Sequence, residues 1–502
     1  MTWIASCGAV IALLLFPVFS WAAGNWSDEV LYFVLVDRFA DGDNSNNRKV
    51  ERRNPGGYHG GDLKGLTQNL DELTDLGVTA LWINPVQKQM ANGMYAQAPA
   101  KLGIPEFQHF GFHGYWIDDF TTVEPQFGTV ADLKHLVDEA HKRGIKVLLD
   151  VVYNHSGYNS SYADRRTSGG EAWLRGTEGN CEVDPVKCRV GGLPDFRTEL
   201  PEVRDYLLKA NIDLAKQAGV DGFRLDTYKH VESDFWLEHR RRTRSEIGKD
   251  FFLLAEQWGG TASSLDPFFA RDEVDAGFDF SFKGSCESFV NGRGRAIAFG
   301  SYLGKRHVIR KGFHVAHYLS SHDEPMALAN LGKDKEKFRL CAAVQMTSIG
   351  IPVIYYGEEV GRGGSEWPTN RNDMPWGDKD TGPGRGLARD ESLRAFYKAL
   401  LRIRHQHPSL ARGNYSLLSG PQDSLMAYLR SDDESKDSIV VIVNRDDATA
   451  SADFPVPEGW NDKTAVDELN GERVSCDNGR LKLSMLPKSV RILSLNPGKV
   501  VR

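Results

Sequence analysis

Basic clusters, long apolar runs and cysteine are all scarce in this sequence. The formal net charge is −7 and the lysines and arginines form no block, which disfavours a nucleic acid or an anionic membrane as partner. Beyond the N-terminal segment, no apolar run is long enough to cross a membrane. Hydrophobic residues nevertheless make up 41% of the 502 residues, which is ample for a large core.

The N-terminal segment has the features of an export signal. Residues 8–19 form an apolar run that is too short to span a bilayer, and residues 20–22 (Ser-Trp-Ala) offer a small-x-small cleavage site. Residues 1–6 contain no Lys or Arg, so an N-terminal anchor is the competing interpretation. We favour a signal peptide over residues 1–22, and hence a secreted or periplasmic protein with no membrane contact after the signal is removed.

The six cysteines cannot all pair within the chain, because Cys7 would leave with the signal and five would remain. Cys181 and Cys188 lie close together in a polar, Gly-rich segment, and export permits a disulfide between them. The other three are scattered along the chain, and we expect buried free thiols at Cys286, Cys341 and Cys476.

Apolar strands alternate with amphipathic helices through most of the chain. The expected strands cover residues 30–37, 80–84, 145–152, 220–226, 251–256, 274–280, 317–323 and 351–356. Eight strands separated by helices predict an α/β fold, a (β/α)8 TIM barrel. A doubly wound open sheet is the alternative, but no glycine fingerprint follows the first strand.

Two segments fall outside this alternation. Residues 154–200 form a long polar insertion after the third strand, and from residue 412 short alternating runs predict an antiparallel β domain. The predicted organisation is a signal at 1–22, a barrel at 23–153 and 201–411, an inserted domain at 154–200 and a C-terminal β-sandwich at 412–502.

Charged and polar side chains recur at the ends of the expected strands. Asp150, Asn154 and His155 follow the third strand, Arg224 and Asp226 the fourth, Glu256 the fifth, and His322 and Asp323 the seventh. The carboxyl ends of barrel strands meet at one mouth, so these carboxylates and histidines would converge there. A zinc site is the competing chemistry, but the histidines lack its spacing and no cysteine joins them.

Two carboxylic acids on either side of one bond are the requirement for glycoside hydrolysis. Arg224 lies two residues before Asp226, would point the same way and would favour the ionised form of a nucleophile. Glu256 follows a fully apolar run, so burial could keep the proton of a general acid. Histidines such as His155 and His322 are suited to binding sugar hydroxyls.

Four motifs carry a resemblance to a known family. They are Asp150-Val151-Val152-Tyr153-Asn154-His155, Gly222 to His230, Glu256-Gln257-Trp258 and Ser321-His322-Asp323. With this order and spacing the sequence resembles, over residues 29–500, the α-amylase family of retaining glycoside hydrolases and transglycosidases. Its nearest likeness is to secreted bacterial α-amylases and to cyclodextrin glucanotransferase and cyclomaltodextrinase relatives.

The resemblance implies roles for individual residues. The nucleophile would be Asp226, the acid/base Glu256 and the transition-state stabiliser Asp323. Substrate contacts would come from Tyr115, His155, Arg224, Lys229, His322 and Arg371. The insertion would be the family's domain B, and the tail its domain C.

The resemblance also implies Ca²⁺ as a cofactor, at two sites. A hard cation takes six to eight oxygen ligands, and one loop resembles the calcium site of cyclodextrin glucanotransferases and some bacterial α-amylases. Its ligands would be Asp41, Asp43, Asn46, Asn47, Gly60 and Asp62. A solvated turn is the alternative interpretation of that loop. The second set would join domain B to the barrel through Asn154, Asp195 and the main-chain carbonyl of His230.

The resemblance predicts a secreted, endo-acting α-amylase that hydrolyses α-1,4-glucosidic bonds of starch and maltodextrins with retention, through a covalent glycosyl-enzyme. Lys229 matches starch-acting members, where it reaches an acceptor-side glucose. Four residues before Arg371 many relatives carry an Asp, but here the residue is Trp367, which leaves the product profile open. The alternatives are a hydrolase or transglycosylase that prefers cyclodextrins or maltooligosaccharides, and a non-catalytic glucan-binding subunit. We expect a monomer whose partner is the α-glucan substrate.

Overall fold

The computed structural model describes residues 25–418, 423–457 and 459–496, without the side chains of residues 307 and 308. Eight parallel strands close into a barrel in the order β1-β12-β11-β10-β9-β8-β7-β2. They are β1 (Leu31–Val34), β2 (Ala80–Ile83), β7 (Lys146–Val151), β8 (Gly222–Leu225), β9 (Phe252–Ala255), β10 (Ala276–Phe278), β11 (His314–Tyr318) and β12 (Ile351–Tyr355). The predicted (β/α)8 barrel is confirmed.

Seven of the strands lie within the predicted ranges, and the strand predicted at 317–323 is displaced. Strands such as β1, β8 and β9 are buried at every position, because helices cover the barrel outside and side chains fill it inside. The displaced strand, β11, ends at Tyr318. Residues 319–323 therefore form a loop at the barrel mouth rather than the end of a strand.

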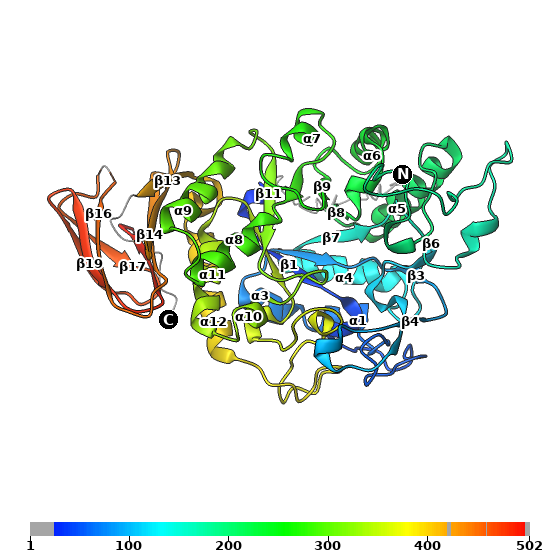
Figure 1. Cartoon of the computed structure of the whole chain (residues 1–502), viewed down its shortest axis with the longest axis horizontal. Coiled ribbons are helices and arrows are strands. Elements are labelled where there is room, and N and C mark those ends of the chain that lie inside the picture. Colours follow the sequence, from blue (N-terminus) through cyan, green and yellow to red (C-terminus); the bar gives the residue numbers. More distant parts are fainter. Residues whose placement is uncertain (1–24, 419–422, 458, 497–502) are drawn as a thin grey trace, which may run out of the picture.

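The helices surround the barrel (Figure 1). They are α1 (Val36–Phe39), α2 (Leu63–Gln68), α3 (Leu70–Leu76), α4 (Val130–Lys142), α5 (Pro201–Ala218), α6 (Ser233–Glu246), α7 (Asp266–Ala270), α8 (Ser281–Val290), α9 (Ala296–Gly304), α10 (Ala327–Asn330), α11 (Lys335–Thr347), α12 (Glu391–Gln406) and α13 (Pro408–Arg412). Helix α4 begins with a capping box of Thr129 and Asp132. Helices α2 and α3 are separated only by Asn69, and Gly77 caps the end of α3.

Two insertions lie on the side of the barrel where β4 is labelled (Figure 1). The first follows β2 and contains β3 (Gln87–Gln89), β4 (Met94–Ala96), β5 (Phe107–His109) and β6 (Ile117–Val123), which form two small antiparallel sheets. The second, residues 154–200, follows β7 and holds short 3₁₀ turns. Within it, Cys181 and Cys188 form the predicted disulfide. The remaining described cysteines are buried free thiols, as predicted.

The C-terminal part is an antiparallel β domain on the far side of α9, α11 and α12 (Figure 1). Its strands are β13 (Asn414–Leu418), β14 (Leu425–Asp432), β15 (Asp437–Asn444), β16 (Ala450–Pro455), β17 (Lys463–Asp467), β18 (Arg473–Asp477), β19 (Arg480–Met485) and β20 (Ser489–Ser494). The hydrogen-bonded order is β13-β14-β15-β20-β17-β18-β19-β16. Strands β14 and β16 contribute to one apolar core, so the sheet folds over on itself.

The predicted signal peptide, residues 1–22, lies outside the described residues, so export stays a prediction. In the described part of the chain, no helix is long and apolar enough to cross a membrane.

Candidate active site

The side chain of Arg224 lies at the centre of the barrel mouth and is fully buried. Its Nη1 donates to Asp150 Oδ1 and Oδ2 at 3.0 and 3.1 Å and to Asp226 Oδ1 at 2.7 Å. Its Nη2 pairs with Glu256 Oε1. Strands β7, β8 and β9 are neighbours in the barrel, which brings these carboxylates onto one guanidinium. Such compensation is what allows several charges to be buried together.

Asp226 offers one carboxylate oxygen for chemistry. Oδ1 accepts from Arg224, whereas Oδ2 is buried and has no hydrogen-bond partner among the described residues. The main chain turns sharply just after it, because Thr227 adopts φ = +47°, a region that a β-branched residue rarely visits. Such strain is typical of functional sites. An uncommitted oxygen on an ion-paired carboxylate suits a nucleophile.

Glu256 has the environment of a general acid. It is buried, and burial raises its pKa to about 8, although the charge of Arg224 acts in the opposite direction. Oε2 accepts a hydrogen bond from the main-chain N–H of Thr227 at 2.9 Å. The adjacent carboxylate Asp226 also raises the pKa. A buried carboxyl with a raised pKa beside an ion-paired carboxylate is the arrangement that glycoside hydrolysis needs.

Asp323 belongs to a separate group of contacts on the loop after β11. Arg371 Nη2 lies 3.1 Å from Asp323 Oδ1, and its Nε donates to the main-chain oxygen of His322 at 2.9 Å. Burial lowers the pKa of His322 to about 3, and its Nε2 lies 3.0 Å from Asp323 Oδ2. Although burial acts to raise the pKa of Asp323, His322 and Arg371 outweigh it and leave that pKa lowered. The carboxylate is therefore held ionised.

Aromatic side chains form one wall of the mouth. Tyr115 stacks on His322 with ring centroids 5.2 Å apart, and its hydroxyl donates to Asp150 Oδ2 at 2.7 Å. His155 Nε2 lies 3.2 Å from the main-chain oxygen of Tyr115. The predicted sugar-binding residues Tyr115, His155, Arg224, His322 and Arg371 thus lie in one connected group. Lys229 is in the short 3₁₀ helix after β8 and is exposed.

Sequence reasoning gave no role to two tryptophans of this site. The indole N–H of Trp82 donates to Asp150 Oδ2 at 3.1 Å, and Trp258 is 48% exposed beside Phe280. Trp258 lines a small pocket with Glu256 and Asp323, so it can contact whatever occupies the mouth. The signal was present for both, since Trp82 lies in an expected strand and Trp258 follows Glu256 by two residues.

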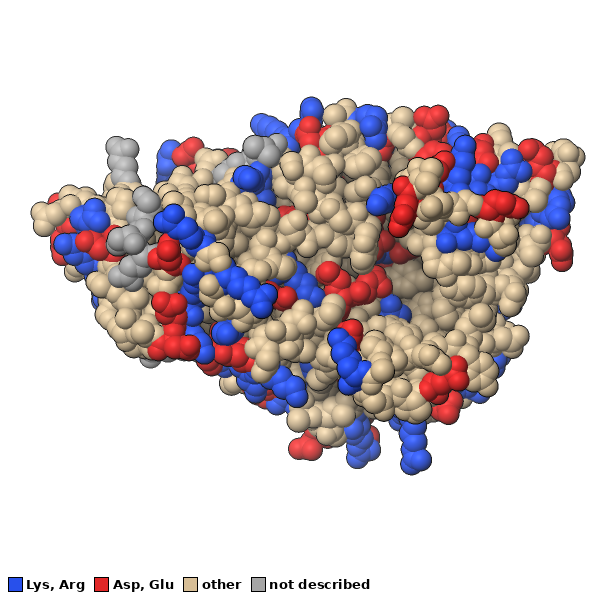
Figure 2. Space-filling model, in the orientation of Figure 1, with Lys and Arg blue, Asp and Glu red and all other residues tan. Residues whose placement is uncertain are grey.

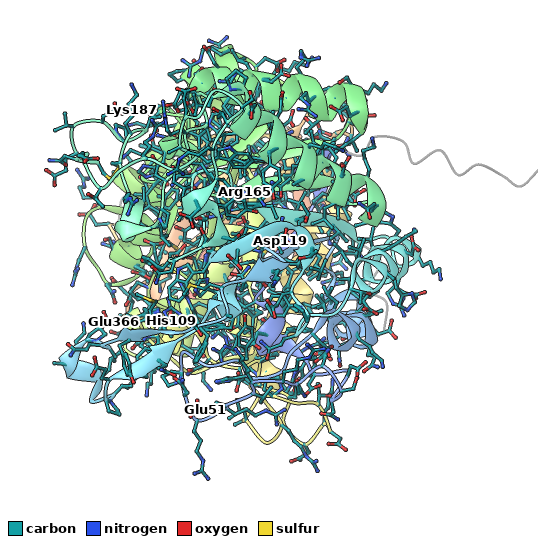
Figure 3. All side chains as sticks on the ribbon, turned by 90° about the vertical axis from the view of Figure 1, so that its right-hand side faces the viewer. Glu51, His109, Asp119, Arg165, Lys187 and Glu366 are labelled. Atoms are coloured by element: carbon teal, nitrogen blue, oxygen red, sulfur yellow. A yellow bond between two sulfur atoms is a disulfide. The ribbon has the colours of Figure 1, made fainter. Side chains whose placement is uncertain are left out.

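Trp367 packs against the first insertion. Its ring packs against Phe107 and His109, with centroids 5.4 and 5.6 Å apart. Beside it, Glu366 pairs with Lys101 at 2.6 Å, which joins this loop to the insertion between β4 and β5. Figure 3 shows Glu366 and His109 next to each other, with Lys187 of the other insertion at the opposite end of this face.

A hollow with acidic side chains at its edge lies near the middle of the face shown in Figure 2. A separate cavity of about 910 Å³ lies elsewhere in the molecule. It is lined by residues at or just before the first residues of strands, such as Asp221, Asp275 and His314, and therefore lies at the other end of the barrel. It contains none of the predicted site residues.

The loop predicted to bind calcium has converging oxygens. Asp41 Oδ1, Asn46 Oδ1 and Asn47 Oδ1 are buried and lack hydrogen-bond partners among the described residues. Gly60 has φ = +97°, and a Cβ there would lie 2.7 Å from Asn47 Oδ1, so the main chain passes directly beside these oxygens. Asp62 accepts from Asn46 Nδ2 at 2.8 Å. Unpaired buried oxygens of this kind fit a hard cation.

The side chain of Asp43, a predicted calcium ligand, does not join the other predicted ligands. Its carboxylate accepts from Ser45 at 2.6 Å and lies 3.4 Å from Lys64, away from the cluster. No group of three or more His, Cys, Asp or Glu side chains in the described chain could hold a metal. The loop at residues 41–62 would instead depend on amide and main-chain oxygens with only two carboxylates.

The second predicted calcium set meets as expected but does not fit a metal. With its amide oriented to satisfy its neighbours, Asn154 donates Nδ2 to Asp195 Oδ1 at 3.2 Å and to the main-chain oxygen of His230 at 2.9 Å. Arg175 Nε lies 2.7 Å from Asp195 Oδ2. The ligand oxygens therefore already face N–H donors and a positive charge.

The barrel and its mouth define a glycoside hydrolase: one ion-paired carboxylate, one buried carboxyl with a raised pKa, and an aromatic wall suited to a sugar. Comparison with known proteins gives the family. The model "Alpha amylase, catalytic domain" matches residues 33–178 and 186–385, and "Neopullulanase-like, C-terminal domain" matches residues 418–493. The chain belongs to the α-amylase family and is an enzyme of the type that acts on α-glucans.

Two curated relatives and one solved structure illustrate the likeness. Neopullulanase 2 of Thermoactinomyces vulgaris is 32% identical over 498 residues, which cover 93% of this chain and 78% of that protein. A cyclomaltodextrinase of a Bacillus species is 32% identical over 449 residues, covering 84% and 73%. The crystal structure of an Anoxybacillus α-amylase has a TM-score of 0.81 at 28% identity, and the match covers 95% of this chain and 99% of that one.

Proposed function

We propose that this enzyme hydrolyses α-1,4-glucosidic bonds in cyclodextrins and short maltooligosaccharides with retention of configuration. The observation that supports retention best is the shared guanidinium of Arg224, which holds Asp226 on one nitrogen and Glu256 on the other. Retaining enzymes need carboxyls about 5–5.5 Å apart, closer than inverting enzymes do, because no water has to fit between nucleophile and sugar.

The reaction would proceed in two steps. Asp226 Oδ2 attacks the anomeric carbon while Glu256 gives its proton to the glycosidic oxygen, so the leaving sugar departs as an alcohol and a glycosyl-enzyme ester forms. Glu256, now ionised, takes a proton from water, whose oxygen attacks the same carbon and releases Asp226. Asp323 and His322 would bind the hydroxyls of the attacked sugar, and the ring of Tyr115 would face it.

The substrate preference rests on the relatives rather than on the catalytic residues, since these would serve any α-glucan. The matched C-terminal model is neopullulanase-like, and the two curated relatives are named as a neopullulanase and a cyclomaltodextrinase. The runner-up is the predicted endo-acting α-amylase on starch. It is favoured by the Anoxybacillus α-amylase, whose chain is matched over almost its full length.

Initial rates on β-cyclodextrin, maltoheptaose, soluble starch and pullulan separate these candidates. We expect kcat/KM on the first two substrates to exceed that on starch by at least about tenfold. Comparable rates on starch, with a broad range of oligosaccharides appearing early, would favour the α-amylase instead.

We also propose Ca²⁺ at the first loop, with Asp41, Asn46, Asn47, Gly60 and Asp62 as the residues that would hold it. The orphaned oxygens of that loop support this assignment. The ion would supply positive charge that stabilises the loop, and no catalytic step involves it.

A further inference from the structure

The junction between the 154–200 insertion and the barrel is built around Asp195, whose side chain is almost completely buried. Its main-chain segment runs beside residues 154–156. Phe196 N donates to Asn154 O at 2.8 Å, and Ser156 N donates to Pro194 O at 3.0 Å. His155 lies between these two contacts and forms an isolated antiparallel β-bridge with Asp195. The position of Asp195 therefore bears directly on a residue of the catalytic mouth.

Arg175 supplies the positive charge at this junction. Besides its 2.7 Å contact with Asp195 Oδ2, the guanidinium binds Glu199 through both Nη atoms, at 2.9 and 2.5 Å. The main chain fixes the residue as well, since Arg175 N donates to Asp195 O at 2.8 Å. Arg189 Nη2 in turn donates to the main-chain oxygen of Arg175 at 3.0 Å. Both the guanidinium and the main chain of Arg175 are thus held by residues of the insertion.

A calcium ion and this guanidinium cannot share the same carboxylate. Both oxygens of Asp195 are engaged, Oδ1 by the amide of Asn154 and Oδ2 by Arg175. A divalent ion on these oxygens would lie within a few ångströms of another full positive charge, in a site with little water to screen it. It would also need six to eight oxygens, whereas Asn154, Asp195 and the His230 carbonyl offer at most four, one of which Arg175 engages.

We propose that Arg175 takes the place of a metal ion at this junction, as a positioning residue. Its guanidinium fixes Asp195, and Asp195 with Asn154 then orients His155 and the loop that carries Lys229 and His230. Two contacts connect this loop to the junction. Asn154 contacts the His230 carbonyl, and His230 Nδ1 lies 2.7 Å from the main-chain oxygen of Pro185.

The proposal predicts that removing the guanidinium creates a calcium site. In Arg175→Ala the carboxylates of Asp195 and Glu199, the carbonyl of His230 and a reoriented Asn154 amide would be free to bind an ion. Arg197→Ala is the matched control, because Arg197 also pairs with Glu199 but does not contact Asp195. Calcium bound per chain is counted by equilibrium dialysis of full-length protein that has first been stripped with a chelator.

We expect Arg175→Ala to bind one more calcium ion per chain than the wild type and Arg197→Ala. Without added calcium, kcat on β-cyclodextrin should fall by up to about a hundredfold in Arg175→Ala, because catalytic groups shift, and calcium should restore most of it. Equal ion counts in Arg175→Ala and the wild type would overturn the proposal.

If Arg175→Ala does not fold, the calcium count of Asp195→Asn, in the otherwise unchanged chain, tests the proposal. An ion count equal to that of the wild type supports the proposal, and the loss of one ion overturns it. The effect on kcat rests on the proposed function, whereas the ion count does not. A chain that gains an ion but never cleaves cyclodextrin would contradict the proposed function alone.

Discussion

At the scale of single residues, burial of Glu256 favours the protonated form that a general acid needs. Arg224 contacts the carboxylates of both Asp226 and Glu256, but Glu256 is buried deeply enough that its pKa rises to about 8. Glu256→Gln should lower kcat about 10²- to 10⁴-fold, the range that general acid–base catalysis supplies. The cavity and the contact with Thr227 N are preserved by an isosteric amide, so an unchanged melting temperature shows that the loss is chemical.

The raised pKa of Glu256 also predicts the alkaline limit of activity. The acid must be protonated to release the leaving sugar, so kcat/KM should fall as the pH rises through about 8. A pH profile of kcat/KM on maltoheptaose measures this. An alkaline limb near the ordinary glutamate pKa would contradict the role of burial at this residue.

Trp367 bears on the length of the products. Its ring packs with those of Phe107 and His109, at the position where the family resemblance implies an Asp in many members. Trp367→Asp should lengthen the products formed early from maltoheptaose, with kcat changed less than about threefold. Chromatography of early products tests this. Tyr95→Ala, an exposed aromatic on β4, is a control that should leave the product distribution unchanged.

At the scale of elements, the loop at residues 41–62 should contribute stability only when calcium is bound. A ligand present at 100 times its Kd stabilises the folded state by about 2.7 kcal/mol. A chelator should therefore lower the melting temperature of the wild type but not that of Asp41→Ala. Asp43→Ala should retain the full calcium effect, because its carboxylate points to Ser45 and Lys64. Loss of the effect in Asp43→Ala alone would contradict this assignment.

Elements also set the limit of prediction from sequence. The barrel strands were predictable because strands buried on both faces are continuous apolar runs, as in β1 and β9. The small sheets of the first insertion were missed, since three-residue strands such as Gln87–Gln89 have no period to detect. The catalytic group was predictable because strand ends converge in a barrel. Arg175 was not, because it lies 20 residues from Asp195 in an aperiodic segment.

At the scale of the whole molecule, His407 links the barrel to the C-terminal domain. Nδ1 lies 2.9 Å from Asp437 Oδ1 and Nε2 lies 3.3 Å from Glu468 Oε1. Although burial acts to lower its pKa, these carboxylates raise it to about 9. Because the pKa of His407 is higher in the folded than in the unfolded protein, its ion pairs stabilise the folded state fully below the unfolded pKa of about 6.5. This stabilisation is lost as the pH rises through about 9.

The contribution of His407 is at most about 3 kcal/mol for a shift of this size. His407→Gln should therefore destabilise the protein at pH 6 and have little effect at pH 10. Urea denaturation at both pH values measures this. Equal destabilisation at the two pH values would show that packing, rather than charge, accounts for the role of the residue.

The central claim is that Asp226 and Glu256 form a retaining pair in an enzyme that acts on α-glucans. Proton NMR of the first product of β-cyclodextrin opening, recorded before mutarotation, tests it most directly. The account predicts that the new reducing end appears as the α-anomer and then relaxes toward the equilibrium mixture. Initial appearance of the β-anomer would contradict it.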